Sequence, residues 1–240
     1  MSETCRLSKR VAEQFICSRS EAEQYIEGGW ITVDGQLQDE VGVRVAPQQT
    51  VARLADAVLA PIEPVTILLH KPGGLSADGA IDPALGWITP ATHCATDQSA
   101  QRFLRRHTRA LTLTNPLDEQ ASGLLVLTQD WRIVRKLHTE SARIEQEFVI
   151  DVRGALPAQQ LQSALAALRW NGKPVAGKLS WQSEQRLRFA QKGVERGMVT
   201  HVCNALGLEV TAWKRLRIGR IGLGGLAPGG WRYLSGYERF

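Results

Sequence analysis

The sequence predicts a chain of mixed helices and strands in two parts. Helix patterns and a hairpin signal occupy residues 6–35, whereas short apolar runs typical of strands recur through the rest of the chain. Between them, residues 57–64 contain two prolines and little polar turn chemistry, which predicts a semi-rigid linker. We therefore expect residues 1–56 to form a small module and residues 65–240 to form a larger domain.

The composition is that of an ordinary globular protein. The chain has 240 residues, of which 43% are hydrophobic and 22% are charged, enough for one domain of typical size and a small one. No apolar run approaches the roughly 18–20 residues that a membrane span needs. Charged residues, and no apolar signal core, follow the first five residues. We expect a cytoplasmic protein that makes no use of a membrane.

The cysteines give no sign of a metal site or a disulfide framework. All four are scattered without a C-x-x-C pair, and the five histidines show no ligand spacing. We expect neither a structural metal nor structural disulfides.

Basic residues are concentrated in the second part. Residues 1–60 carry six Lys/Arg and nine Asp/Glu, while residues 61–240 carry 23 and 15. Residues 186–220 alone contain eight basic residues and two acids. Such an excess predicts a surface that faces phosphate groups. A charged face that serves only solubility is an equally good interpretation of the charge alone.

The first part reads as two short helices and a hairpin. Apolar residues recur at four-residue spacing on the first helix, namely Leu7, Val11 and Phe15. Ser18 and Glu21 form a capping-box pattern at the start of the second helix. Asp34-Gly35 is a strong two-residue hairpin signal between strands.

The second part begins with an apolar run that ends in the turn sequence H-K-P-G-G at residues 70–74. Residues 76–109 carry no clear pattern before a basic run. Its arginines are expected near the central loop, as RNA contacts or as a solvated basic loop; they are Arg102, Arg105, Arg106 and Arg109. Further along, the patterns predict helices at 131–137 and 157–168 and strands at 146–152, 178–182 and 186–190.

The stretch 115–130 organises the second part. A short apolar run, residues 124–127, follows Ser122-Gly123 and predicts a core strand. Asp118 therefore lies on a loop that a rigid strand positions, which is a usual place for a catalytic carboxylate. An Asx-turn aspartate that satisfies local backbone donors is the structural alternative.

Residues 117–130, L-D-x-x-x-S-G-L-L-V-L-T-x-D, resemble the central motif of the RsuA-type ribosomal pseudouridine synthases. Residues 6–35 resemble the small RNA-binding module named after the fourth small-subunit ribosomal protein. The segment from Leu206 resembles the C-terminal end of the RluF-like branch. The resemblance implies an α+β fold in which that module precedes a catalytic domain on a largely antiparallel mixed sheet. It also implies an RNA partner, no cofactor and a monomer.

The resemblance also implies roles for particular residues. Asp118 stands at the position of the nucleophile, and Phe148 stands where the family has the aromatic residue that lies against the flipped base. Predicted RNA contacts on the module are Arg6, Lys9, Arg10 and Arg19. Those on the second domain are Lys71, Arg196, Lys214 and Arg215.

The chain departs from the family pattern at polar positions near the predicted pocket. Pro116 replaces an arginine, and residues 197–201 replace a stretch like R-Q-x-R-R. An ionised carboxylate in a water-poor pocket needs a cation within ~4–6 Å. We expect this cation to be Arg217 or Arg220, because a strand holds a side chain rigidly; Arg196 and His201 are alternatives.

Two functions follow from these observations. The first is an active RNA pseudouridine synthase that acts on ribosomal or transfer RNA. The second is a catalytically retired relative that binds RNA in ribosome assembly or RNA folding. The presence of Asp118 at the nucleophile position and of the pocket strand favours the enzyme, whereas the altered basic positions favour the retired relative.

Overall fold

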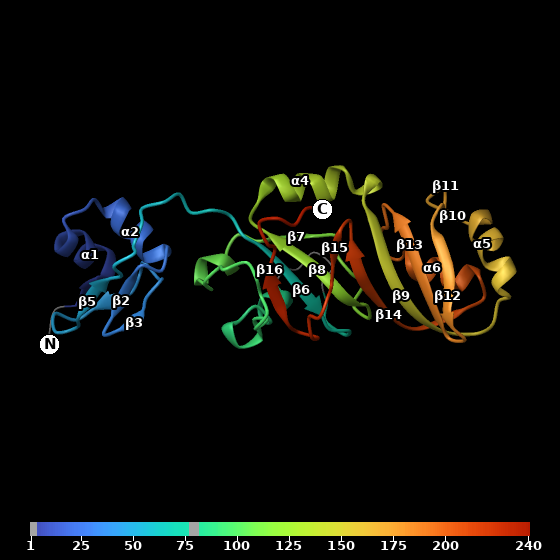
Figure 1. The fold of residues 1–240 in the computed structure, drawn as a ribbon, viewed down its shortest axis with the longest axis horizontal. Coiled ribbons are helices and arrows are strands. Elements are labelled where there is room, and N and C mark those ends of the chain that lie inside the picture. The colour runs from blue at the N-terminus through green and yellow to red at the C-terminus, as the bar shows by residue number, and fades with distance from the viewer. Residues whose placement is uncertain (1–3, 77–81) are drawn as a thin grey trace. The chain divides into compact units, whose positions relative to one another are not determined.

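The computed structural model describes residues 4–76 and 82–240, which form two compact units (Figure 1). The first unit contains the chain up to Pro64 and Arg102–Arg109. The second contains Val65–Gln101 and Ala110–Phe240. Across the described residues, no helix combines the length and the apolar character that crossing a membrane requires.

The first unit packs two helices against short antiparallel strands. Its core is apolar and includes Leu7, Val11, Ile26 and Ile31, each fully buried. Its elements are β1 (Cys5–Arg6), α1 (Leu7–Phe15), α2 (Arg19–Glu27), β2 (Ile31–Val33), β3 (Gln36–Leu37), β4 (Arg44–Val45) and β5 (Val51–Arg53). The strands pair in the order β3-β2-β5, with β1 and β4 paired separately.

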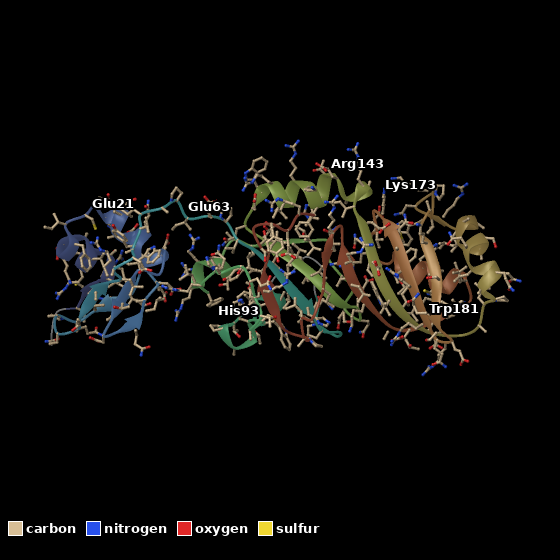
Figure 2. All side chains as sticks on the ribbon, in the orientation of Figure 1. Glu21, Glu63, His93, Arg143, Lys173 and Trp181 are labelled. Atoms are coloured by element: carbon tan, nitrogen blue, oxygen red, sulfur yellow. The ribbon has the colours of Figure 1, made fainter. Side chains whose placement is uncertain are left out.

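Local sequence signals explain these elements. At the start of α2, the Ser18 side chain accepts a hydrogen bond from the Glu21 amide, and the Glu21 carboxylate accepts one from the Ser18 amide, which confirms the capping box. Glu21 is labelled in Figure 2. Asp34 and Gly35 both have positive φ, as the tight turn between β2 and β3 requires.

The basic run at 102–109 belongs to the first unit. Arg102 donates to the carbonyl of Gly29 at 2.9 Å, and Arg105 pairs with Glu40 at 2.7 Å. Within this run His107 is buried, and burial lowers its pKa to about 4. Arg102 and Arg105 thus bind groups of the first unit. No local sequence pattern records that a segment docks on a distant one.

The second unit is built on a nine-stranded mixed sheet, which confirms the predicted α+β class (Figure 1). The strand order is β12-β13-β9-β14-β8-β6-β16, with β7 beside β8 and β15 beside β14, and β14–β8 is its parallel pair. Its strands are β6 (Thr66–Lys71), β7 (Thr112–Thr114), β8 (Ser122–Thr128), β9 (Glu145–Arg153), β12 (Lys178–Ser183), β13 (Arg186–Lys192), β14 (Glu209–Ile218), β15 (Ile221–Gly222) and β16 (Trp231–Tyr233).

Helices complete two apolar cores on this sheet. One core joins α5 and α6 to β9, β12 and β13, and the other joins α4 to β6 and β8. The helices are α3 (Asp82–Leu85), α4 (Trp131–Thr139), α5 (Ala158–Ala167) and α6 (Met198–Ala205), with single 3₁₀ turns at η1 (Pro90–Thr92) and η3 (Ser141–Arg143); the 3₁₀ turn η2 (Arg105–Thr108) belongs to the first unit. A small hairpin is formed by β10 (Arg169–Trp170) and β11 (Lys173–Pro174).

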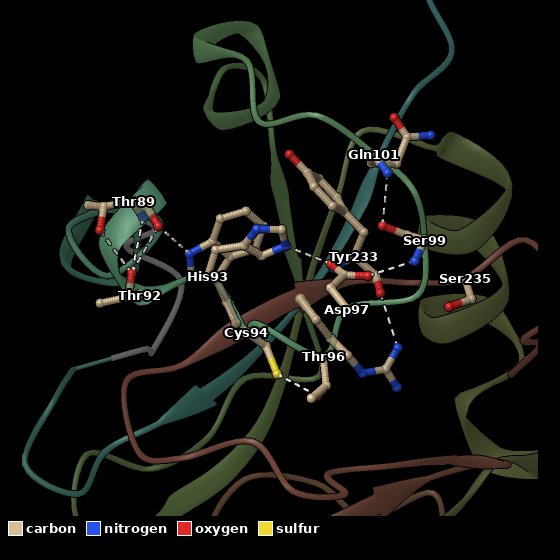
Figure 3. A network of polar contacts seen from close by, with 12 residues as sticks. Thr89, Thr92, His93, Cys94, Thr96, Asp97, Ser99, Gln101, Tyr233 and Ser235 are labelled. Carbon is tan, nitrogen blue, oxygen red and sulfur yellow. Dashed lines mark hydrogen bonds and ion pairs between the residues drawn. The ribbon is translucent and has the colours of Figure 1, made fainter.

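A polar network fixes the loop after η1 to β16 (Figure 3). Asp97 accepts hydrogen bonds from the ring of His93 at 2.7 Å and from the amides of Tyr233 and Ser99, each at 2.8 Å. The His93 ring stacks on Trp231 with a centroid distance of 4.2 Å. Although burial opposes ionisation of Asp97, these donors hold its pKa below the ordinary value.

The backbones of β8 and β14 approach each other closely at Gly123 and Arg215. Gly123 pairs with Arg215 in the parallel register and has a φ of +112°. A Cβ at Gly123 would lie 2.3 Å from the carbonyl oxygen of Arg215, so a side chain does not fit. Glycine is thus required by both backbone conformation and close approach.

Replacing Gly123 by Ala should destabilise the second unit by roughly 3 kcal/mol, because it adds both backbone strain and a backbone clash. The matched control is Gly172→Ala, where φ is +76° but nothing lies within 4 Å of the added Cβ. This control should lose only about 1 kcal/mol. Urea unfolding measures both variants, and equal losses would contradict the close-approach argument.

Candidate active site

Asp118 lies on the loop between β7 and β8, at the edge of the core. Its neighbours Leu117 and Ala121 are buried in the core of α5 and α6, while the Asp118 side chain is 23% exposed. The Ala121 amide donates to the Asp118 carbonyl at 3.1 Å. The loop is therefore anchored on both sides of a carboxylate that solvent still reaches.

Two donors bind this carboxylate. Arg196 donates from Nε to Oδ1 at 2.9 Å, and the Gly197 amide donates to Oδ2 at 3.4 Å. Gly197 is the N-cap of α6. A helix N-terminus and a guanidinium are both donor groups that suit a carboxylate.

The expected partners Arg217 and Arg220 are not beside Asp118. Arg217 pairs with Glu145 at 2.6 Å and with Glu147 at 3.0 Å, and Arg220 is exposed at the turn between β14 and β15. A register shift between Arg215 and Arg217 in the β14–β9 pairing turns the strand at this point. The prediction for these two residues is wrong, and Arg196 is the cation in contact.

Lys71 is buried and binds backbone carbonyls, which contradicts its prediction as an RNA contact. It is fully buried, and its Nζ donates to the carbonyls of Ala121 at 2.6 Å, Glu119 at 2.9 Å and Pro72 at 3.1 Å. Burial lowers the Lys71 pKa to about 8, against the attraction of Glu119 and Asp118. Lys71 thus holds the C-terminal half of the Asp118 loop.

Arg215 holds the beginning of the same loop, so its prediction as an RNA contact is also wrong. Its guanidinium donates to the carbonyls of Asn115 at 2.6 Å and Leu124 at 2.8 Å, and to Oε1 of Gln146 at 3.1 Å. Burial lowers the Arg215 pKa to about 9, which leaves the cation charged at neutral pH.

Phe148 lies beneath the loop and has no open face. It is 1% exposed, and its ring packs 5.7 Å from that of Trp213 and 6.4 Å from that of Phe189, centroid to centroid. The structure therefore contradicts the prediction that Phe148 is a platform for a flipped base. Its burial makes it a core residue of the α5 and α6 side.

An aromatic residue beside the Asp118 site, at the rim formed by Gly197, is Trp170, which the sequence reasoning missed. Its indole donates to Glu195 at 2.8 Å, and its Cη2 atom would lie 3.4 Å from a Cβ on Gly197, whose amide binds Asp118. The hairpin signal Asn171-Gly172 next to Trp170 marks this turn in the sequence. His201 packs edge-on against Trp170 and bonds the Arg169 carbonyl, away from the carboxylate.

Three of the four predicted cations of the first unit line one hollow. Arg6, Lys9 and Arg19 line this hollow of about 820 Å³ together with Arg44, which was not predicted. Arg10 lines a different hollow, so the four predicted cations do not all converge. In the second unit, Lys214 is half-buried on β14 beside Ser122.

Among residues 4–76 and 82–240, no group of three or more His, Cys, Asp or Glu side chains is placed to hold a metal ion.

Comparison with known proteins gives relatives over the whole chain. The S4 domain matches residues 5–51. The chain is 28% identical to the ribosomal large subunit pseudouridine synthase B of Bacillus subtilis (strain 168), over 97% of this chain and 93% of that one. It is 26% identical to the dual-specificity RNA pseudouridine synthase RluF of Escherichia coli (strain K12), over 97% and 76%.

The fold is similar to that of a solved pseudouridylate synthase, with a TM-score of 0.59 over 96% of each chain at 20% identity. At this identity the likeness shows the fold. The S4 domain and the whole-length relatives confirm the resemblance to RsuA/RluF-like pseudouridine synthases that the central motif predicted.

Lys71→Met should destabilise the second unit by roughly 3 kcal/mol at pH 7, because three carbonyls lose their donor. The folded pKa of about 8 lies below the ordinary 10.5, so between these values the unfolded chain binds the proton that the folded chain releases. The contribution of Lys71 to the free energy of unfolding therefore rises from pH 8 to 10.5.

Urea unfolding of the wild type and Lys71→Met at pH 7.5 and pH 9.5 measures this effect. The difference between the two proteins should be larger at pH 9.5. A difference that shrinks or stays constant across this window would show that burial does not depress the Lys71 pKa.

Proposed function

We propose that this chain, a whole-length relative of the RsuA/RluF-like pseudouridine synthases, isomerises a uridine in ribosomal RNA with Asp118 as nucleophile. The observation that carries the proposal is the Asp118 carboxylate, held on a fixed loop and bound by Arg196 and the Gly197 amide at the N-terminus of α6. Its relatives named as RNA pseudouridine synthases and its S4 domain support RNA as the substrate.

The chemistry suits a carboxylate. Isomerisation breaks the bond between C1′ of the ribose and N1 of the uracil, and forms a bond between C1′ and C5. The C5 proton is lost and N1 gains a proton, so neither oxidation nor reduction occurs. A carboxylate serves as covalent nucleophile or as base toward the sugar, once the uridine has been flipped out of its stack.

Arg196 supplies the cation that the altered basic stretch lacks. Its guanidinium is 46% exposed, so it contacts Asp118 and solvent together and is in a position to meet the phosphate of an entering nucleotide. Trp170 offers the aromatic face at this rim, and we assign base stacking to it in place of the buried Phe148.

We also propose the oligomeric state, the RNA substrate and the location of the protein. Asp118 is contacted by Arg196 and the Gly197 amide of its own chain, and we propose a monomer because the family resemblance implies one. Ribosomal RNA is favoured over transfer RNA because a whole-length relative is named for the large ribosomal subunit. We place the protein in the cytoplasm on the basis of this substrate.

The retired RNA-binding relative is the second candidate. Pro116 and residues 197–201 replace basic positions of the family pattern, and Gly197 itself carries no side chain toward Asp118. RNA with 5-fluorouridine at the target separates the two candidates. An active enzyme forms a stable adduct with it, whereas a retired relative binds the RNA without an adduct.

Asp118→Asn should abolish isomerisation and leave RNA affinity within a few fold, because the shape of the side chain is kept. Arg196→Met should lower kcat/KM by about 10- to 100-fold, since it removes a charge-assisted hydrogen bond to the carboxylate. Release of tritium from RNA labelled at uridine C5 measures both.

Arg217→Met is the matched control, because this arginine also pairs with carboxylates but on Glu145 and Glu147. Its turnover should stay within about threefold of the wild type. Turnover by Asp118→Asn, or an equal loss in Arg217→Met and Arg196→Met, would contradict the assignment of Asp118 and Arg196.

A further inference from the structure

Ile16 is held in an unfavourable conformation and contributes almost nothing to the core. It is the C-cap of α1, with φ of +52° and ψ of +55°, and it is 94% exposed. The left-handed region disfavours β-branched side chains, and helix ends in this conformation usually carry Gly or Asn. A strained, exposed isoleucine at this position points to a function outside the folded core.

The surrounding structure enforces this conformation. The amides of both Ile16 and Cys17 donate to the Ala12 carbonyl, which closes the end of α1. The capping box of Ser18 and Glu21 fixes the start of α2 directly afterwards. Ile16 is therefore presented at the bend between two fixed helix ends, and its side chain is aimed into solvent.

The two helices that Ile16 joins also line the cationic hollow. Ala12 and Lys9 of α1 and Arg19 of α2 belong to it, together with Arg6 and Arg44. Partial compensation comes from Glu13, 3.8 Å from Lys9, and from Glu23, 2.9 Å from Arg19. Long cations around a shallow hollow suit the phosphates of a nucleic acid backbone, which position a strand without reading its bases.

We propose that Ile16 is an RNA-contacting residue of the module, whose aliphatic tip packs on ribose and base surface while the neighbouring cations hold the phosphates. Ile16 follows Ala12 and Glu13 and precedes Arg19, which all line the hollow, and its apolar tip fits the less polar part of a nucleotide. The inference uses the RNA binding of the first unit and is independent of whether Asp118 turns over.

Stability and binding should change in opposite directions on replacement of Ile16. In the full-length chain, Ile16→Gly and Ile16→Asn relieve the strained backbone, so the slowest-exchanging amides of α1 and α2 should exchange about 3- to 10-fold more slowly with deuterium. The same variants should bind a folded RNA stem-loop about 3- to 10-fold more weakly.

The salt dependence of RNA affinity distinguishes an apolar contact by Ile16 from a contact between a cation and a phosphate. The plot of log affinity against log salt should keep its slope in both Ile16 variants, because no phosphate contact is lost. Lys9→Met should instead reduce the slope by about 1. Val58→Asn, at a 58% exposed apolar residue of the same unit, should leave affinity and slope unchanged.

Unchanged affinity in both Ile16 variants would overturn the proposal, as would a slope that falls as in Lys9→Met. An equal loss in Val58→Asn would also overturn it, by showing a general effect of surface apolarity. A wild-type chain that binds the stem-loop with this Ile16 dependence, but forms no adduct with 5-fluorouridine RNA, would refute the proposed isomerisation and leave this inference standing.

Discussion

Two buried cations hold the loop that carries Asp118, and the arrangement of the second unit depends on them. Lys71 at the end of β6 and Arg215 in β14 donate to carbonyls at Asn115, Glu119 and Ala121. Buried charges are tolerated only when they are well hydrogen-bonded, and these loop carbonyls provide that partner set. Because β6 and β14 flank β8 on its two sides, the strand order of the sheet brings both cations to one loop.

This constraint divides the basic residues by task. Lys71 and Arg215 are buried and bind backbone carbonyls, and Arg217 forms ion pairs with Glu145 and Glu147. Arg196 and the cations of the first unit remain partly accessible. A count of charges along the sequence thus overstates the surface that is available for phosphate, since it cannot separate buried cations from exposed ones.

Local signals predicted much of the fold. The capping box, the Asp34-Gly35 turn and the apolar run of β8 each act within a few residues, and the structure confirms them. The errors concern non-local facts. A lysine at the end of a strand gives no sign that the distant carbonyls of Glu119 and Ala121 will bind it, and the register shift between Arg215 and Arg217 depends on pairing with β9. The aromatic face at Trp170 depends on the packing of a hairpin against α6.

Arg196 and the Gly197 amide at the N-terminus of α6 bind the Asp118 carboxylate, next to residues 197–201, which replace a basic stretch of the family pattern. The most direct test is a map of pseudouridines in the ribosomal RNA of cells that lack this protein, compared with cells in which the wild-type chain has been restored. The account predicts that one pseudouridine disappears and returns with the chain. Identical maps for ribosomal RNA in the two cell types would contradict it.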